Sequence, residues 1–327
     1  MSFYILWGSL EIGLVFSLVA LGVFITFRVL NFPDLTVDGS FPLGGAVAAT
    51  LVSQGHDPFL ATAIATVAGA VAGVLTGWLN VSLKIMDLLA GILVMIALYS
   101  INLRVMGGPN VPLISEPVVF SFLPGWGPDY IERPLALLAL VLVIKLLLDR
   151  FFASARGLAL RATGANPRMA RAQGVDTGSA VLLGMAISNA LVALAGALFA
   201  QSQGGADISM GIGTIVIGLA AVIVGEGVLP ARRIVWTTLA VVLGAVLYRL
   251  FVALALNSDV LGLQAQDLNL VTAILVGVAL VLPRLLKRRR MPRAGTGAVR
   301  AGTGPHAGAG TGTGAGTGTA VSSDRRN

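Results

Sequence analysis

The chain of 327 residues is 56% hydrophobic and only 11% charged, with a formal net charge of +7. Soluble domains carry about 25% charged residues, so this composition excludes a single water-soluble domain and indicates several membrane-spanning helices. The absence of cysteine excludes disulfides, iron–sulfur clusters and thiol catalysis. The two histidines, His56 and His306, lie far apart without other ligands nearby, and the sequence therefore predicts no metal site.

Apolar runs of about 20 residues predict an all-α membrane protein with about nine spanning segments, within a range of about eight to ten. In chain order, these segments cover residues 8–30, 35–55, 58–83, 87–104, 134–152, 179–201, 208–229, 233–255 and 267–286. The second segment contains Asp38, Pro42 and several glycines, and the seventh is also rich in glycine. Because proline removes a backbone donor and glycine weakens a helix, we expect one or both segments to be broken or re-entrant.

The basic residues predict the orientation. With the N-terminus outside, the inner loops and ends hold all of the 22 Lys and Arg residues except Arg104, Arg133 and Arg249. This asymmetry satisfies the positive-inside rule and predicts a multi-pass protein of a bacterial cell membrane with a cytoplasmic C-terminus. Anionic lipid explains the basic residues more simply than nucleic acid does. Residues 1–290 form the predicted transmembrane domain, and the Ala/Gly/Thr-rich residues 291–327 form a predicted disordered cytoplasmic tail.

The predicted inner loop 153–178 contains a local helix signal. Asn166 is a suitable N-cap, Pro167 suits the first helical position, and Gly174 suits the end of a helix. A short cytoplasmic helix is therefore predicted at residues 167–173. Two of its faces carry Arg168 with Arg171 and Met169 with Gln173. The spacing alone favours equally a helix that contacts a soluble motor protein and a plain basic loop that satisfies the positive-inside rule.

Asp34 and Asp38 lie at the start of the second segment, with Arg28 nearby as a candidate partner. A carboxylate at membrane depth is a candidate functional group, but Asp, Gly, Ser and Pro also form ordinary turns. We favour the turn and keep open a translocation path that includes Asp34, Asp38, Pro42 and Asn189. For Asn189, inside the sixth segment, a hydrogen bond between helices is favoured over a solute contact.

Two further patterns predict contacts between segments. Glu226, at the inner end of the seventh segment, is expected to pair with Arg232 or Arg233. Small residues recur at a spacing of four, which predicts closely packed helix faces. They are Gly69, Gly73 and Gly77 in the third segment and Ala193 and Ala197 in the sixth.

Two motifs, taken together, resemble a known family. Gly157, Arg161, Ala162, Gly164 and Asn166 follow the order of a cytoplasmic motif that precedes a small-residue helix. Residues 31–45, NFPDLTVDGSFPLGG, resemble the motif after the first helix of the same family. The chain thus resembles the permeases of the branched-chain amino acid and ribose type of ABC importer. The string PDLTVDGSFPLG is similar to a sub-branch associated with amino-acid-type binding proteins.

The resemblance implies a permease subunit that forms the translocation path for a small solute, most simply an amino acid or a related compound. It implies a second permease copy, ATP-binding subunits and an external solute-binding protein as partners, and transport by alternating access. The implied ATPase-coupling residues are Asn166, Pro167, Arg168, Met169, Arg171, Gln173 and Gly174.

The chain itself is predicted to be neither an enzyme nor the holder of a cofactor. A P-loop needs Gly-Lys-Ser/Thr, and Lys84, Lys145 and Lys287 each follow Leu or Ile, so ATP would be hydrolysed by a partner subunit. The alternative is an ion-coupled secondary transporter, which would need a carboxylate near the membrane midplane. A passive channel would need a filter motif or a charged ring, and neither is visible.

Overall fold

The computed structural model describes residues 3–256, apart from 115, 123–124, 126–127 and 231–232, together with the single residue Gly277. Helices dominate this part of the chain, and one antiparallel pair of short strands joins two of its loops. The elements are α1 (Phe3–Val23), the π-helix η1 (Phe24–Leu30), α2 (Val37–Ser53), α3 (Pro58–Val81), α4 (Asp87–Met106), β1 (Asn110–Pro112), η2 (Val119–Phe122), α5 (Asp129–Ala153), α6 (Ala155–Ala165), α7 (Pro167–Ala172), α8 (Thr177–Gln203), β2 (Gly205–Asp207), η3 (Ile208–Gly211), α9 (Thr214–Val228) and α10 (Ile234–Leu256).

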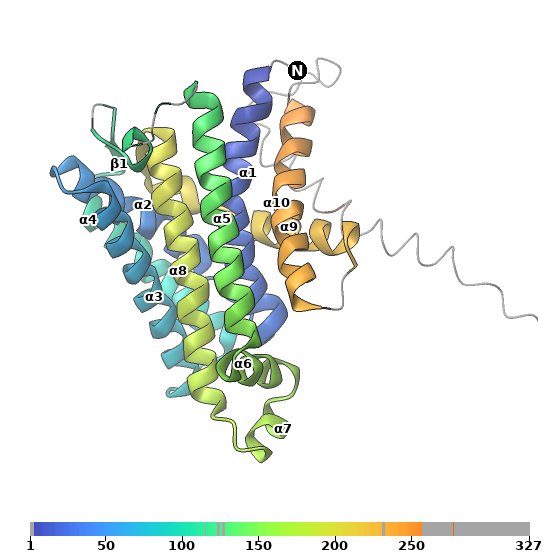
Figure 1. Cartoon of the computed structure of the whole chain (residues 1–327). Helices are drawn as coiled ribbons and strands as arrows, with labels where there is room; N and C mark the ends of the chain where they lie inside the picture. The colour runs from blue at the N-terminus through green and yellow to red at the C-terminus, as the bar shows by residue number, and fades with distance from the viewer. Residues whose placement is uncertain are drawn as a thin grey trace, which may run out of the picture.

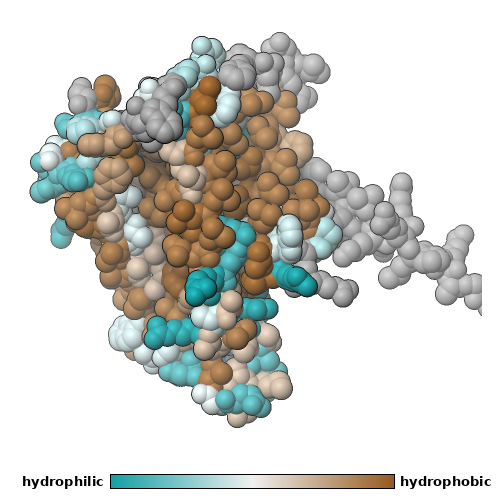
Figure 2. Space-filling model, viewed as in Figure 1, coloured by the Kyte–Doolittle hydropathy of each residue, from teal (hydrophilic) through white to brown (hydrophobic). Residues whose placement is uncertain are grey.

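Within the described residues, six helical stretches are long and apolar enough to cross a membrane. They are α1 with η1, α3, α4, α8, η3 with α9, and α10. The prediction of nine segments is therefore not confirmed, and the ninth segment and the tail 291–327 lie outside the described residues. Figure 2 shows hydrophobic residues over the middle of the bundle and hydrophilic residues gathered around α6 and α7. This distribution fits a multi-pass membrane protein.

The second and fifth predicted segments form helices but are not among these six. Helix α2 has 17 residues, which at 1.5 Å per residue gives about 26 Å, less than the hydrocarbon thickness of about 30 Å. Helix α5 carries Lys145 and Asp149, whose side chains form an ion pair with Nζ and Oδ2 2.5 Å apart. The Thr238 hydroxyl of α10 donates to Asp149 Oδ1 at 2.6 Å. Pairing lets these two charges remain buried within the bundle.

The expected break is found in the seventh segment and not in the second. Helix α2 is continuous even though Pro42 lies inside it. Gly211 packs closely against the Asp38 carbonyl and the Pro42 ring, so that a Cβ on Gly211 would overlap both. In the seventh segment, η3 ends at Gly211, Gly213 adopts a left-handed φ of +81°, and α9 begins at Thr214. A residue with a side chain is strained at such a φ.

The helices pack around α1 and α8. Helix α1 contacts α5, α8, α9 and α10, and α8 contacts α2 and α3. The predicted small-residue faces do meet: a Cβ on Gly69 would overlap Ala193, and one on Gly73 would overlap the Met185 carbonyl oxygen. Glycine on α3 therefore lets its backbone approach α8 closely, as the spacing predicts.

Two of the predicted inner loops lie beside each other, because the α3–α4 turn and the loop 153–178 line one cavity. Figure 1 shows α6 and α7 at the end opposite the N-terminus and β1. The loop 153–178 contains more structure than predicted, because α6 precedes the expected short helix. The Ser154 hydroxyl caps α6 by accepting from Gly157 N at 3.3 Å. The Ala, Leu and Arg residues of α6 are good helix formers, a signal that could have revealed this helix.

Candidate functional site

The predicted helix at the end of the bundle is α7. Asn166 is its N-cap, with Oδ1 accepting from Met169 N at 3.1 Å, and Pro167 is its first residue. The helix ends at Ala172, and Gly174 has a φ of +81°. The local capping signals therefore predicted this helix to within one residue.

The side chains of α7 face different surroundings. Ala170 is buried, whereas Met169 is 63% exposed. Arg168 and Gln173 are also exposed. Arg171 lines a cavity beside the helix. Helix α7 thus has one face on the protein and presents an apolar Met169 side chain outward, where a second protein could bury it.

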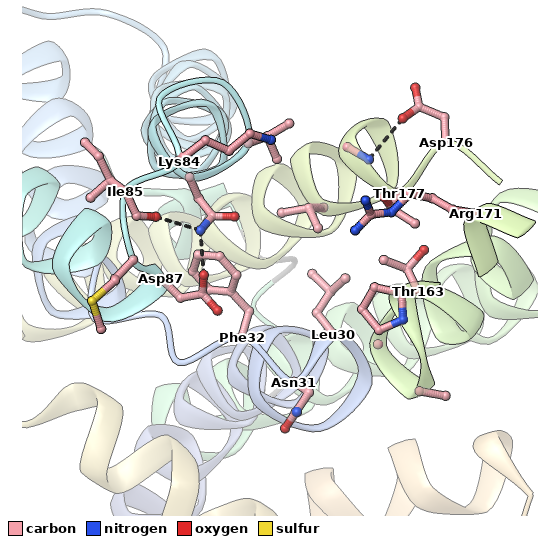
Figure 3. A pocket seen from close by; sticks show the side chains of 18 residues that line it. Leu30, Asn31, Phe32, Lys84, Ile85, Asp87, Thr163, Arg171, Asp176 and Thr177 are labelled. Atoms are coloured by element: carbon pink, nitrogen blue, oxygen red, sulfur yellow. Dashed lines mark hydrogen bonds between the residues drawn. The ribbon is translucent and has the colours of Figure 1, made fainter. Parts of the chain in front are cut away.

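The cavity beside α7 has a volume of about 740 Å³ and is drawn in Figure 3. Four segments form its walls: the chain after η1, the α3–α4 turn, the α6–α7 region and the start of α8. Its lining residues are Leu30, Asn31, Phe32, Asn80, Val81, Lys84, Ile85, Met86, Asp87, Thr163, Gly164, Ala165, Pro167, Arg171, Asp176, Thr177, Gly178 and Val181. The cavity therefore lies between the predicted coupling helix and the ends of five other elements, which are η1, α3, α4, α6 and α8.

Hydrogen bonds hold the polar walls of this cavity. Asn80 Nδ2 donates to Ile85 O at 2.8 Å and to Asp87 Oδ1 at 2.5 Å, as Figure 3 shows. Asp176 caps α8 by accepting from Gly178 N at 3.0 Å and Ser179 N at 3.2 Å. The Ser179 hydroxyl and these backbone donors lower the pKa of the Asp176 carboxyl below its ordinary value.

Two lining residues adopt left-handed backbone conformations. Asn31 has a φ of 56° and Lys84 a φ of 58°, and no other residue except glycine has a positive φ in the described part of the chain. Such conformations cost free energy for residues with a Cβ and concentrate at sites where the fold needs a particular chain direction. Here they turn the chain out of η1 and from α3 into α4, beside the same cavity.

Helix α6 contacts η1 directly through glycine. A Cβ on Gly164 would overlap the Val29 carbonyl oxygen and lie 2.9 Å from Leu30 Cα. The same residue belongs to the motif that carries the family resemblance. Glycine at this position is therefore needed because the backbones of α6 and η1 touch there.

Asp34, Ser40 and Asn189 form a buried polar network between α2 and α8. Asn189 Nδ2 donates to Asp34 Oδ2 at 2.8 Å, and the Ser40 hydroxyl donates to Asn189 Oδ1 at 2.8 Å. Asp34 Oδ1 also accepts from Thr36 N at 2.9 Å, which forms a turn before α2. All three network side chains are fully buried. This supports the predicted turn at Asp34 and a packing role for Asn189.

Asp38 caps a helix that is far away in the sequence. Its Oδ1 accepts from Ile215 N, at the start of α9, at 2.8 Å. The N-cap position of α9 is Gly213, which has no side chain to accept this bond. The carboxylate therefore satisfies a backbone donor and lies at the positive end of the α9 dipole.

The predicted partner of Asp34 and Asp38 was wrong, whereas the predicted pairing of Glu226 is tested only in part. Arg28 does not pair with Asp34 or Asp38; its Nε lies 2.6 Å from Glu226 Oε1. Glu226 thus pairs with Arg28 of η1 rather than with Arg233, and Arg232 lies outside the described residues. Local spacing suggested the nearest charges, whereas packing of η1 against α9 brings the distant pair together.

A second cavity, of about 460 Å³, lies between α2, α4 and the chain at 208–212. Two of the predicted path residues, Asp38 and Pro42, line it, but Asp34 and Asn189 do not. The other lining residues are Gly39, Met95, Ile96, Tyr99, Ser100, Asn102, Ile208 and Ile212. Sequence analysis missed Asn102, which is fully buried and lies in an otherwise ordinary apolar segment.

The Ser40 hydroxyl offers a test of the buried network. Ser40→Ala leaves Asn189 Oδ1 without this donor and should lower the free energy of unfolding by about 1–3 kcal/mol. Ser17→Ala is the matched control, because buried Ser17 donates only to Leu14 O of its own helix. Thermal unfolding in detergent micelles measures both variants. Equal midpoints for the two would contradict the importance of the Ser40–Asn189 bond.

Comparison with known proteins gives consistent matches. The family described as branched-chain amino acid transport system, permease component, matches residues 5–282. The tyrosine transport system permease protein of Clostridioides difficile is 40% identical over 264 residues, which cover 81% of this chain and 86% of that protein. A probable branched-chain amino acid transport permease protein of Methanocaldococcus jannaschii is 28% identical over 61% of this chain and 66% of its own. A galactofuranose transporter permease protein of Escherichia coli is 27% identical, covering 66% and 62%. No solved structure matches the chain.

Proposed function

The chain belongs to the permease family of branched-chain amino acid transport systems, and we propose that it is the membrane-spanning permease subunit of an ABC importer. Family membership agrees with the resemblance read from the two motifs, and its relatives are transport subunits. The solute that we propose is an amino acid, because the relative with 40% identity is named a tyrosine transport permease. The finer sub-branch given by the PDLTVDGSFPLG string stays a prediction.

The observation that carries the proposal is α7 at the end of the bundle. A short, capped helix with an exposed Met169 provides a contact surface for an ATP-binding subunit, the partner in which we place ATP hydrolysis. The coupling residues would be Asn166, Pro167, Arg168, Met169, Arg171, Gln173 and Gly174. A second permease copy and an external solute-binding protein complete the proposed importer.

The contacts suggest how a motion of α7 reaches the solute path. Helix α7 contacts α6, and Gly164 of α6 rests on the backbone of η1. From η1 the chain leads through the turn at Asp34 into α2, and Asp38 of α2 holds the start of α9. Displacing α7 would therefore shift the α2 wall of the 460 Å³ cavity. In this mechanism the cavity opens alternately to either side, and Asp38 and Pro42 belong to the path.

Reconstitution tests this function against the ion-coupled alternative. The permease, purified together with its ATPase and solute-binding protein, is placed in liposomes with radiolabelled tyrosine and leucine. We expect uptake that requires ATP on the side of the liposome membrane where the ATPase lies. This uptake should persist without an ion gradient. Uptake driven by a sodium or proton gradient without ATP would instead establish a secondary transporter.

The proposed orientation is tested by cysteine labelling, which is direct because the chain has no native cysteine. His56→Cys, in the exposed turn between α2 and α3, should react with a membrane-impermeant maleimide in intact cells. Ala172→Cys, at the exposed end of α7, should react only after the cells are opened. Both expectations follow from the basic residues on the inner side. The reverse labelling pattern would show that the protein has the opposite orientation in the membrane.

A further inference from the structure

A third cavity, of about 400 Å³, lies where three spanning stretches end near α6. Its walls come from η1, the end of α9, the start of α10 and helix α6. The apolar stretches Tyr4–Leu30, Ile208–Val228 and Ile234–Ala255 each contribute residues from one end. Because a spanning helix ends near the level of the lipid headgroups, the cavity lies at that level.

The charged residues of this cavity leave it with a net positive charge. They are Arg28, Arg161 and Glu226. Arg28 Nε lies 2.6 Å from Glu226 Oε1, so this pair is neutral as a whole. Arg161 forms no ion pair with any residue in the described part of the chain, and the exposed Arg233 directly precedes a lining residue of α10. The cavity therefore favours an anion.

Both arginines of the lining can reach a ligand. The Arg28 side chain is 63% exposed, and Arg161 is also exposed. A guanidinium group carries five N–H donors, and Nε of Arg28 bonds to Glu226, which leaves its terminal nitrogens for a ligand. Together with the donors of Arg161 they match the oxygens of a phosphate group, which guanidinium groups bind in a bidentate manner.

The apolar surroundings favour a lipid over a free phosphate. Phe27 and Ile234 are half-buried and line the cavity. Val235 and Trp236, the next residues of α10, are 45% and 55% exposed. Tryptophan is enriched at the headgroup level of membranes. A free phosphate would leave this apolar surface uncovered, whereas the acyl chains of a phospholipid would cover it.

Helix α6 has the character of a helix at the membrane surface. Figure 1 shows it lying across the end of α5 instead of continuing along the bundle. It carries Arg156 and Arg161, and its Leu158 side chain is 52% exposed. Exposed basic and apolar residues on one helix fit the boundary between anionic headgroups and acyl chains.

We propose that this cavity binds the headgroup of an anionic phospholipid from the leaflet nearest α6. Arg161 is the principal ligand of the lipid phosphate, and Arg28 assists it. The acyl chains lie against Phe27, Ile234 and Trp236. The assignment goes beyond the transport function and does not depend on which solute is carried.

Titration with three probes tests the site. The full-length permease in detergent micelles receives phosphatidylglycerol, phosphatidylcholine or glycerol phosphate, and the rise in its thermal unfolding midpoint gives each affinity. We expect phosphatidylglycerol to bind several-fold more tightly than phosphatidylcholine, because the choline cation cancels the phosphate charge. Glycerol phosphate has the phosphate without the acyl chains and should give no stabilisation at the same concentration.

Variants of the lining residues identify the ligand. Arg161→Gln should weaken phosphatidylglycerol binding roughly tenfold, because charged hydrogen bonds to the phosphate are lost. Arg156→Gln removes the same charge from the same helix but lies outside this cavity; it is the matched control and should leave the affinity unchanged. Glu226→Gln should strengthen binding, because it removes the carboxylate that occupies Arg28. This opposite effect tests the site even where Arg161→Gln fails to fold.

Several results would overturn the lipid site. An equal loss of affinity in Arg161→Gln and Arg156→Gln would indicate only a general attraction to basic residues. Equal binding of the two phospholipids would exclude a site for anionic lipid, and stabilisation by glycerol phosphate as strong as by phosphatidylglycerol would assign the cavity to a soluble phosphate ester. The transport function is tested separately, because lipid binding needs neither ATP nor partner subunits. Failure of ATP-driven uptake would refute the importer and leave the lipid site intact.

Discussion

Gly196→Ala is expected to prevent the permease from folding stably, although it adds only one methyl group. Gly196 of α8 faces α2, where a Cβ would overlap the Phe41 carbonyl oxygen and lie 2.8 Å from its carbonyl carbon. The reciprocal position is Gly44 of α2, where an added Cβ would overlap the Ala193 carbonyl oxygen of α8. Both obstacles are backbone, which no rotamer change can move. The two helices must separate, and a cost of about 3 kcal/mol or more follows from the upper range of overpacking.

The matched control is Gly8→Ala in α1, where a Cβ would meet nothing within 4 Å. Alanine favours a helix over glycine by about 1 kcal/mol, so this control should be neutral or slightly stabilising. The yield of monodisperse protein after mild detergent extraction and its unfolding midpoint measure the difference. If Gly196→Ala matched Gly8→Ala in both, the close contact of α2 with α8 would be refuted.

Changes in α7 and at its C-terminal end are expected to reduce coupled transport while leaving the permease folded. Met169→Asp should place an unpaired charge in the contact with the ATPase and reduce ATP-driven uptake about tenfold or more, since such burial costs roughly 2 kcal/mol or more. Gly174→Val should distort the end of the helix, because a β-branched residue resists the left-handed φ of +81°. Arg168→Lys should have a smaller effect, because it retains the charge. Co-purification of the ATPase and uptake in liposomes measure each effect.

Both changes have matched controls at the other end of the bundle. Ile114→Asp adds a charge at an apolar residue that is 88% exposed. Gly55→Val introduces the same backbone strain at a φ of +83°, in a turn with open space around it. Uptake should stay near normal in both. Normal ATPase binding and uptake in Met169→Asp and Gly174→Val would refute the coupling role of α7. The segment would then only supply basic residues on the inner side, which its spacing also allowed.

The sequence alone determined the features that depend on neighbours within a few residues or on composition. Apolar length identified a multi-pass helical protein, since a helix in lipid must satisfy its own backbone. Asn166, Pro167 and Gly174 determined α7, because caps and left-handed ends act within one turn. The Gly69–Gly73 spacing identified a packed face because residues four apart align on a helix.

Tertiary structure alone decided which polar groups, distant from one another in the sequence, pair with each other. Asp38 meets Ile215, Asn189 meets Asp34, and Arg28 meets Glu226, over separations of 177, 155 and 198 residues. No local pattern encodes these pairs, because each depends on which helices pack together and at what height. A carboxylate that packing shields from water must be satisfied by whichever donor the packing brings near, and for the half-buried Asp38 that donor is the backbone of another helix.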